Sequence, residues 1–430
     1  MKVVPNFMEL IVVKGVLLLL LTLTTGYILN CDGAVVVRLD EEKTINERPI
    51  IGVLSQEQSF YLHGKYPEEN YTSYIAASYV KDVEASGARV VPILIGKDRK
   101  YYRDIMSKLN GVLLAVVVRL DEEKTINERP IIGVLSQEQS FYLHGKYPEE
   151  NYTSYIAASY VKDIEASGAR VVPILIGKDR QYYSDIMSKL NGVLFPGGAT
   201  YFNQSDGYAD AGQHIYEIAI ELNDAGDYFP IFGTCLGFEL LIIIASGRGE
   251  KENRIRCYSY NNLPLHFTGD FRSSKMFKEA PEDIVDILAN EDVTINAHQF
   301  CIVDKNMESH DLVKDWRVSS YSDDDYGVRF IATVEHRRYP FYGVQFHPEK
   351  NSFEWKLSKN YAHSMNAIKA NRYFMDFFVG ECRRNLHSFA NVNEENKYVI
   401  YNYEPHFTGI LGSMYHQCYF FEPRGNVTTK

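Results

Sequence analysis

A cysteine and a histidine lie in two short motifs whose neighbours are typical of nucleophilic catalysis. Cys235 is the centre of the motif Gly-Thr-Cys-Leu-Gly, which lies between the apolar runs 228–232 and 238–245. This order predicts a strand, a sharp turn and a helix, a geometry that requires small residues on both sides of the nucleophile. We expect the free N–H groups and the positive end of that helix to favour the thiolate form of Cys235.

The histidine follows a further apolar run. Residues 341–346 predict a strand that ends at His347, and ligands bind at the carboxyl ends of strands in open parallel sheets. We therefore expect His347 to act as general base and then as general acid. Glu349, two residues later, is the candidate that orients the imidazole, unless it serves a structural ion pair.

A third motif supplies candidates for stabilising an oxyanion. The segment 192–198 predicts a strand that ends in the turn Pro-Gly-Gly. The N–H groups of Gly197 and Gly198, with the N–H of Leu236, are candidates for an oxyanion hole. Each motif alone is a weak signal, because such turns and strand ends occur in many folds. Their order along the chain, each at the end of an apolar strand, together predicts one active site with a cysteine nucleophile.

The residues of these motifs and their order along the chain resemble those of the class I glutamine-amidotransferase-like hydrolases, and most closely those of the gamma-glutamyl hydrolases. The resemblance covers about residues 129–421 and includes the segments 155–162, 168–173, 227–230 and 343–350. Phe346 stands where the family often has tryptophan. The resemblance implies an α/β fold of the flavodoxin-like type, with an open parallel sheet and helices on both faces. It also implies a homodimer, a folate-linked polyglutamate as substrate, and no cofactor.

The resemblance also suggests three residues for substrate binding. His298 matches by position a histidine in the family's active-site cleft, and a histidine that caps a loop is the alternative. Glu239 lies one helical turn after the nucleophile, where it is placed to meet the substrate amino group. A surface-facing residue of the helix is the alternative for Glu239. Tyr155 opens the matched segment 155–162.

The expected reaction is attack of Cys235 on the delta carbonyl of a glutamyl side chain, through a gamma-glutamyl thioester that water then cleaves. A glutamine amidotransferase attacks the same bond and releases ammonia, so a glutaminase is the alternative. The sequence contains no synthetase domain to receive ammonia, and this favours the hydrolase. An inactive remnant that only binds is a third hypothesis, against which the intact motifs argue.

An almost exact internal repeat occupies the first half of the chain. Residues 34–114 recur as residues 115–195, and the two copies differ at four positions. Strands that alternate with helices in each copy predict a parallel sheet. Only the second copy continues into the three motifs. We therefore predict a partial, non-catalytic copy at 34–114 and a catalytic domain at 115–430. A recent duplication and an error in gene assembly would leave the same pattern.

The N-terminus predicts a secretory signal within residues 1–33. Lys2 and Lys14 precede the apolar run 15–23, small residues follow it, and cleavage anywhere from 26 to 33 fits. An uncleaved signal anchor is the alternative. Behind such a signal the four sequons become candidate glycosylation sites, and a secreted or lysosomal protein is expected. The sequons are Asn70, Asn151, Asn203 and Asn426.

Charge and cysteine usage exclude several classes of partner. The chain has 430 residues and a net charge of −11, which argues against nucleic acid and against anionic membranes as partners. No Cys-x-x-Cys pair or histidine spacing of the ligand type occurs, so no metal site is expected. Whether the other cysteines form disulfides stays open, because they are few and dispersed.

Overall fold

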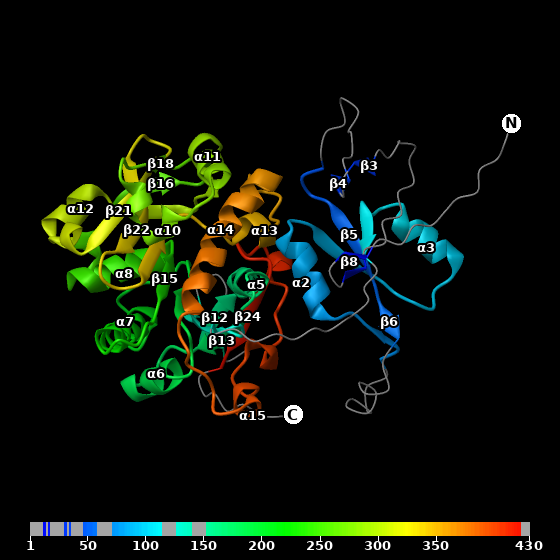
Figure 1. Cartoon of the computed structure of the whole chain (residues 1–430), viewed down its shortest axis with the longest axis horizontal. Coiled ribbons are helices and arrows are strands. Elements are labelled where there is room, and N and C mark those ends of the chain that lie inside the picture. Colours follow the sequence, from blue (N-terminus) through cyan, green and yellow to red (C-terminus); the bar gives the residue numbers. More distant parts are fainter. Residues whose placement is uncertain are drawn as a thin grey trace. The chain divides into compact units, whose positions relative to one another are not determined.

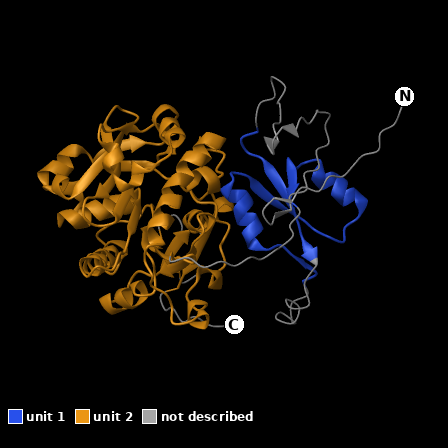
Figure 2. Cartoon of the chain, in the orientation of Figure 1, with its two compact units in different colours: residues 1–123 blue, residues 124–430 orange. Residues whose placement is uncertain are grey.

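The computed structural model describes residues 46–57, 71–113, 126–139 and 152–422, and the backbone of four two-residue strands before them. These strands form two antiparallel pairs, β1 (Val12–Val13) with β2 (Val16–Leu17) and β3 (Asn30–Cys31) with β4 (Ala34–Val35). The rest of the predicted signal segment lies outside the described residues, as do Asn70, Asn151 and Asn426. The chain divides into two compact units, residues 1–123 and 124–430 (Figure 2).

An eight-stranded sheet forms the centre of the second unit, in the order β13-β10-β14-β15-β23-β22-β21-β18. The first five strands are parallel, and they are β13 (Arg170–Ile174), β10 (Ile131–Leu135), β14 (Val193–Phe195), β15 (Ile231–Thr234) and β23 (Phe341–Val344). The last three continue the sheet in antiparallel pairing, and they are β22 (Arg329–His336), β21 (Trp316–Asp323) and β18 (His266–Phe267). The predicted parallel sheet is thus confirmed, and the antiparallel extension is an addition that the sequence analysis did not foresee.

Helices cover both faces of this sheet (Figure 1). One face packs against α5 (Ala158–Ala166), α11 (Glu282–Asn290) and α14 (Met365–Cys382). The other packs against α6 (Arg180–Met187), α7 (Tyr208–Asp224) and α8 (Leu236–Ser246). Side chains of a strand point alternately to its two faces, so Ile132 joins the first apolar cluster and Ile131 the second. Uninterrupted apolar strands are the expected sequence pattern for a sheet buried on both faces.

Smaller elements complete the second unit. A three-stranded antiparallel sheet contains β11 (Gln137–Glu138), β12 (Ser154–Ala157) and β24 (Cys418–Phe421). Two further pairs are β16 (Ile255–Ser259) with β20 (His298–Cys301), and β17 (Asn262–Leu263) with β19 (Thr294–Ile295). The short helices are α9 (Glu250–Asn253), α10 (Lys275–Lys278), α12 (Asp304–Ser309), α13 (Lys350–Phe353) and α15 (Val392–Glu395). Single 3-10 turns are η1 (Phe271–Ser273), η2 (Leu312–Lys314), η3 (Ile400–Asn402) and η4 (Thr408–Leu411).

One disulfide forms among the described cysteines. It joins Cys257 of β16 to Cys301 of β20, both of which are buried. Cys235, Cys382 and Cys418 are buried free thiols. The sequence left this pairing open because 44 residues separate the two partners.

The first unit repeats the opening of the second. Its parallel sheet has the order β8-β5-β9, with β5 (Ile50–Leu54), β8 (Arg89–Ile93) and β9 (Gly111–Leu113). Its helices are α2 (Ala77–Ala85) and α3 (Arg99–Met106), and β6 (Gln56–Glu57) pairs with β7 (Ser73–Tyr74). Ile50 pairs with Arg89 here, as Ile131 pairs with Arg170 in the second unit. The two copies therefore adopt the same local structure and the same strand register.

Equivalent residues of the two copies nevertheless differ in burial. Met106 is 51% exposed whereas its equivalent Met187 is fully buried, and Val112 is 37% exposed whereas Val193 is fully buried. In the second unit β14 pairs with β15 and α6 packs against α7. Among the described residues, β9 pairs only with β5. The first copy thus folds locally but lacks the elements that bury its apolar side chains in the second copy.

We predict that deleting residues 34–114 leaves the activity of the chain intact. The second copy runs directly from β14 into the Pro-Gly-Gly turn, whereas the first copy ends before any such turn. The measurement is the rate of hydrolysis of a gamma-linked polyglutamate by the shortened and the full chain. A shortened protein that is soluble and compact but inactive would make the first copy part of the working enzyme.

Candidate active site

Cys235 lies at the sharp turn that its sequence predicts, between the end of β15 and the start of α8. Its backbone angles are φ 50° and ψ −107°, a region that residues with a side chain rarely adopt. The Cys235 N–H donates a hydrogen bond of 2.7 Å to the carbonyl oxygen of Val344, the last residue of β23. A strained backbone conformation persists only where the surrounding structure holds it in place. Here the hydrogen bond to β23 holds the backbone of Cys235.

Steric crowding requires glycine at the two positions that flank Cys235, Gly233 and Gly237. A Cβ atom on Gly233 would lie 2.7 Å from the backbone carbon of Gly237. A Cβ atom on Gly237 would lie 2.0 Å from the carbonyl oxygen of Phe195. The turn can therefore pack this tightly against β14 only if both positions are glycine.

Strand pairing brings the three predicted motifs together. β15 lies between β14 and β23, with Phe195 paired to Gly233 and Thr234 paired to Val344. The Pro-Gly-Gly turn, Cys235 and His347 therefore follow three neighbouring parallel strands at the same edge. A Cβ atom on Gly197 would lie 2.7 Å from Cε1 of His347 and 3.1 Å from Cβ of Cys235, which places both side chains against Gly197.

His347 and Glu349 form a buried pair. The distance from His347 Nδ1 to Glu349 Oε1 is 2.8 Å, and the two side chains are only 3% and 1% exposed. A carboxylate accepts but does not donate, so Nδ1 carries the proton and Nε2 is left as the basic nitrogen. The structure thus brings together the histidine and the carboxylate that the sequence analysis paired.

Burial keeps the cysteine and the histidine neutral at rest. Burial raises the pKa of Cys235, and the charges of Glu239 and Glu349 raise it further, against Lys350 and a hydrogen bond from the Leu236 N–H. Burial also lowers the pKa of His347, against the charge of Glu349. The Leu236 N–H at the helix end favours the thiolate, as expected, but desolvation outweighs it and the thiol form prevails. The thiol must lose its proton as it attacks.

Two buried residues beside the motifs were not predicted. Gln345 Nε2 lies 3.7 Å from Cys235 Sγ and 3.1 Å from Glu239 Oε1. Lys350 Nζ lies 3.7 Å from Glu349 Oε1 and 4.1 Å from the centre of the Tyr415 ring. Both residues belong to the matched segment 343–350, so the sequence pointed to their positions. It gave no sign of the direction in which their side chains point.

The structure places Glu239 in the site, but its carboxylate already has partners. Its Oε2 accepts a 2.5 Å hydrogen bond from Arg254, and its Oε1 accepts one from Gln345. The Glu239 side chain is 2% exposed, so the surface-facing alternative is excluded. In this arrangement Glu239 fixes Gln345 beside the cysteine sulfur.

The other two substrate-binding candidates are both buried. His298 is buried in β20, with Nε2 3.1 Å from Asn296 Oδ1 and Nδ1 3.7 Å from Cys257 Sγ. Burial, and then the charge of His347, lower the pKa of His298 to about 3. Tyr155 is buried in β12, with its ring centre 6.4 Å from that of Tyr415.

The candidate oxyanion donors have different surroundings. The Leu236 N–H follows Cys235 at the start of α8 and lowers the pKa of the Cys235 thiol, against the larger effect of burial. The Gly197 N–H donates a 2.9 Å hydrogen bond to the hydroxyl of Tyr160. Gly198 is packed so closely that a Cβ atom there would lie 1.7 Å from Gln137 Oε1.

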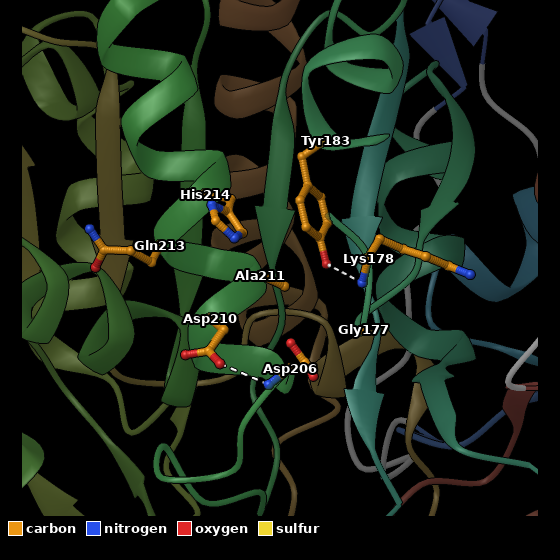
Figure 3. Close-up of a pocket in the computed structure, with 8 residues that line it drawn as sticks. All are labelled: Gly177, Lys178, Tyr183, Asp206, Asp210, Ala211, Gln213 and His214. Carbon is orange, nitrogen blue, oxygen red and sulfur yellow. Dashed lines mark hydrogen bonds between the residues drawn. The ribbon is translucent and has the colours of Figure 1, made fainter. Parts of the chain in front are cut away.

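Two surface cavities lie away from these residues. One of about 220 Å³ is lined by Lys178, Asp210 and His214 near the start of α7 (Figure 3). The other, of about 670 Å³, is lined by Arg129, Arg170 and residues 386–395. In the part of the chain that the structure describes, no group of three or more acidic, histidine or cysteine side chains could hold a metal ion. None of the described helices is long and apolar enough to cross a membrane.

Comparison with known proteins agrees with this geometry. The family model described as peptidase C26 matches residues 49–116 and 130–349, which together make up more than half of the chain. The chain belongs to the peptidase C26 family. The match begins again in the second copy and continues through Cys235, His347 and Glu349.

Curated members of the family have similar sequences over most of their length. A gamma-glutamyl hydrolase of Homo sapiens is 39% identical over 73% of this chain and 96% of its own. One of Mus musculus is 41% identical over 69% and 90% of the two chains. Gamma-glutamyl hydrolase B of Dictyostelium discoideum is 34% identical over 74% and 90%. The chain is accordingly a cysteine-dependent gamma-glutamyl hydrolase.

We predict that Cys235→Ala abolishes hydrolysis of gamma-glutamyl bonds while the fold persists. The change removes the sulfur but hardly alters the volume of the side chain. The loss in kcat/KM should be on the order of a thousandfold or more, because the covalent route disappears. Residual activity within about tenfold of the parent, in a variant with an unchanged circular dichroism spectrum, would show that another residue is the nucleophile.

We also predict that His347→Asn is nearly as damaging as Cys235→Ala. The double variant should be little worse than either single variant, because residues that act as one unit are strongly non-additive. The matched control is His298→Asn, which changes the neighbouring buried histidine. If His298→Asn lost more activity than His347→Asn, the general base would be His298.

Proposed function

We propose that Cys235, His347 and Glu349 form the catalytic triad of this hydrolase, and that its substrates are gamma-linked polyglutamates attached to folate. The observation that carries the proposal is the buried His347–Glu349 pair at the end of β23, beside the cysteine at the end of β15. The names of the relatives support the gamma-glutamyl bond as the target. The resemblance supports the folate-linked substrate.

The first half of the proposed reaction forms a thioester. Cys235 gives its proton to Nε2 of His347 as Sγ bonds to the delta carbonyl carbon of the glutamyl residue. The negative charge that develops on the carbonyl oxygen is met by the N–H groups of Leu236 and Gly198. The C–N bond then breaks, and the imidazolium gives its proton to the leaving nitrogen. Glu349 stabilises the imidazolium while it exists.

The second half of the proposed reaction restores the enzyme. His347 takes a proton from water as the water oxygen attacks the thioester carbon. The C–S bond breaks, the sulfur takes the proton back from His347, and a free gamma-carboxyl group leaves. A neutral Cys235 and a neutral His347 in the resting enzyme fit this order of steps, because each step moves one proton between Sγ, Nε2 and the substrate or water.

Residues outside the site have proposed roles as well. We propose that residues 34–114 are a non-catalytic partial copy and that residues 1–33 direct the chain to secretion or to the lysosome. The resemblance supports a homodimer. Asn203 is exposed in the turn before α7, where a glycan would find room.

Product analysis tests the reaction and separates it from a glutaminase. We expect the chain to shorten a gamma-linked polyglutamate and to leave an alpha-linked peptide of the same length intact. Free glutamine, with ammonia release as the readout, is the second substrate. Rapid ammonia release without cleavage of the gamma-linked chain would favour the glutaminase.

We predict that activity persists into mildly acidic solution. The reaction needs neutral His347, and burial lowers the pKa of His347 from its reference value of 6.5. Because the folded-state pKa lies below 6.5, the neutral form dominates at pH 6.5 and is lost only as the pH falls through the lowered value. The acid limb of kcat/KM against pH should therefore lie below pH 6.5. A midpoint above pH 6.5 would contradict this.

A further inference from the structure

Tyr160 places a hydroxyl group at the centre of the candidate site. It is the third residue of α5, and its side chain is 1% exposed. Its hydroxyl accepts a 2.9 Å hydrogen bond from the Gly197 N–H and lies 3.2 Å from Nδ1 of His347. A buried tyrosine hydroxyl requires a polar partner, and here the partners belong to two of the three motifs.

Other side chains hold the carbonyl groups of the same turn. The Pro196 oxygen accepts hydrogen bonds from Gln137 Nε2 and from the Tyr208 hydroxyl, each of 2.8 Å. The Gly197 oxygen accepts one of 3.2 Å from the Tyr415 hydroxyl. These contacts fix the carbonyl side of the turn, whereas Tyr160 fixes the N–H of Gly197.

The proton of the Tyr160 hydroxyl has one available direction. Its oxygen already accepts from Gly197, and Nδ1 of His347 is a donor to Glu349. Glu349 Oε2 is buried and accepts no hydrogen bond from a described residue, so it is the acceptor open to this proton. Burial first, then the charge of Glu349, raises the pKa of Tyr160. A phenol that donates to a carboxylate stabilises its charged form. Tyr160 therefore links the Pro-Gly-Gly turn to the carboxylate that orients His347.

We propose that Tyr160 is a positioning residue for the hydrolysis, which holds the Gly197 peptide and the Glu349–His347 pair in one hydrogen-bonded network. This inference rests on the proposed function of Cys235, His347 and Glu349. Tyr160 makes no bond to substrate in the proposed reaction. Its loss should weaken the alignment of the turn and make Glu349 more basic, and a more basic Glu349 raises the pKa of His347 as well.

The test is the variant Tyr160→Phe, which removes the hydroxyl but keeps the ring. We expect kcat to fall about tenfold, a smaller loss than removal of a direct oxyanion donor, while KM changes less than twofold. We also expect the acid limb of kcat/KM to move to higher pH, because Glu349 loses a donor. A purely structural role would not move that limb.

The chain offers a matched control in its first copy. Tyr79 is the equivalent of Tyr160, the third residue of α2, in the same local sequence. The first copy has no Pro-Gly-Gly turn and no equivalent of His347, so Tyr79→Phe should behave as the parent. Tyr208→Phe is a second control. It removes another hydroxyl from the same turn, one that donates to the Pro196 oxygen and not to Gly197 or His347, so the acid limb should stay in place.

The outcomes separate this inference from the proposed function. An active Cys235→Ala variant would overturn the proposed site itself. If Cys235→Ala is inactive but Tyr160→Phe keeps the parent kcat and acid limb, only the role of Tyr160 is wrong. A rise in kcat would also contradict it, because the hydroxyl would then be blocking a useful N–H. If the acid limb moved equally in Tyr208→Phe, the shift would come from disturbance of the Pro-Gly-Gly turn and not from the Tyr160 hydroxyl, and the proposal would be wrong.

A second substitution tests the same point without removing any contact. 3-Fluorotyrosine at position 160 keeps the ring and the hydroxyl but makes the phenol a stronger donor. The acid limb should then move to lower pH, opposite to its shift in Tyr160→Phe. This measurement decides the question even if Tyr160→Phe does not fold, and an unmoved limb would overturn the proposal.

Discussion

The parallel pairing of β15 with β14 on one side and β23 on the other is the constraint on which the candidate site depends. Each of the three motifs begins where one of these strands ends, so their meeting is a consequence of strand order and register. The hydrogen bond from Cys235 N–H to Val344 shows how directly the sheet fixes the turn. A one-residue slip between β15 and β23 would reverse the faces of the strand and separate Cys235 from His347.

Burial governs the electrostatics of the same residues. Cys235, His347, Glu349, Glu239 and Lys350 are all less than about one-twentieth exposed, so each charge among them interacts through protein rather than through water. Desolvation holds Cys235 and His347 in their neutral forms, and Arg254, Gln345, His347 and Lys350 stabilise the charge of the two carboxylates. The ionisable groups of the site are therefore coupled. A change in the charge of one of them alters the pKa values of the others.

The sequence predicted the parts of the fold that depend on periodicity and on local turns. The parallel strands, the turn at Cys235 and the neighbouring positions of the three motifs follow from apolar runs and from glycines with a steric purpose. The antiparallel β18, β21 and β22 and the disulfide between Cys257 and Cys301 depend on pairing between distant segments, which no local pattern records. The network of Tyr160 was missed because a tyrosine on the apolar face of a helix looks like core. The raised pKa of Cys235 was missed because burial is a property of the whole fold.

In the described part of the chain β9 has one unpaired edge, whereas its equivalent β14 in the second unit pairs with β15 on that side. In the described part of the chain, this edge presents free backbone groups beside exposed apolar side chains such as Val112 and Met106. An open strand edge of this kind is a template for pairing with strands of other molecules. Pairing at this edge would lower the concentration at which the full chain stays monodisperse. Charge substitutions along β9 are the corresponding route to better solubility, since they leave every residue of the candidate site untouched.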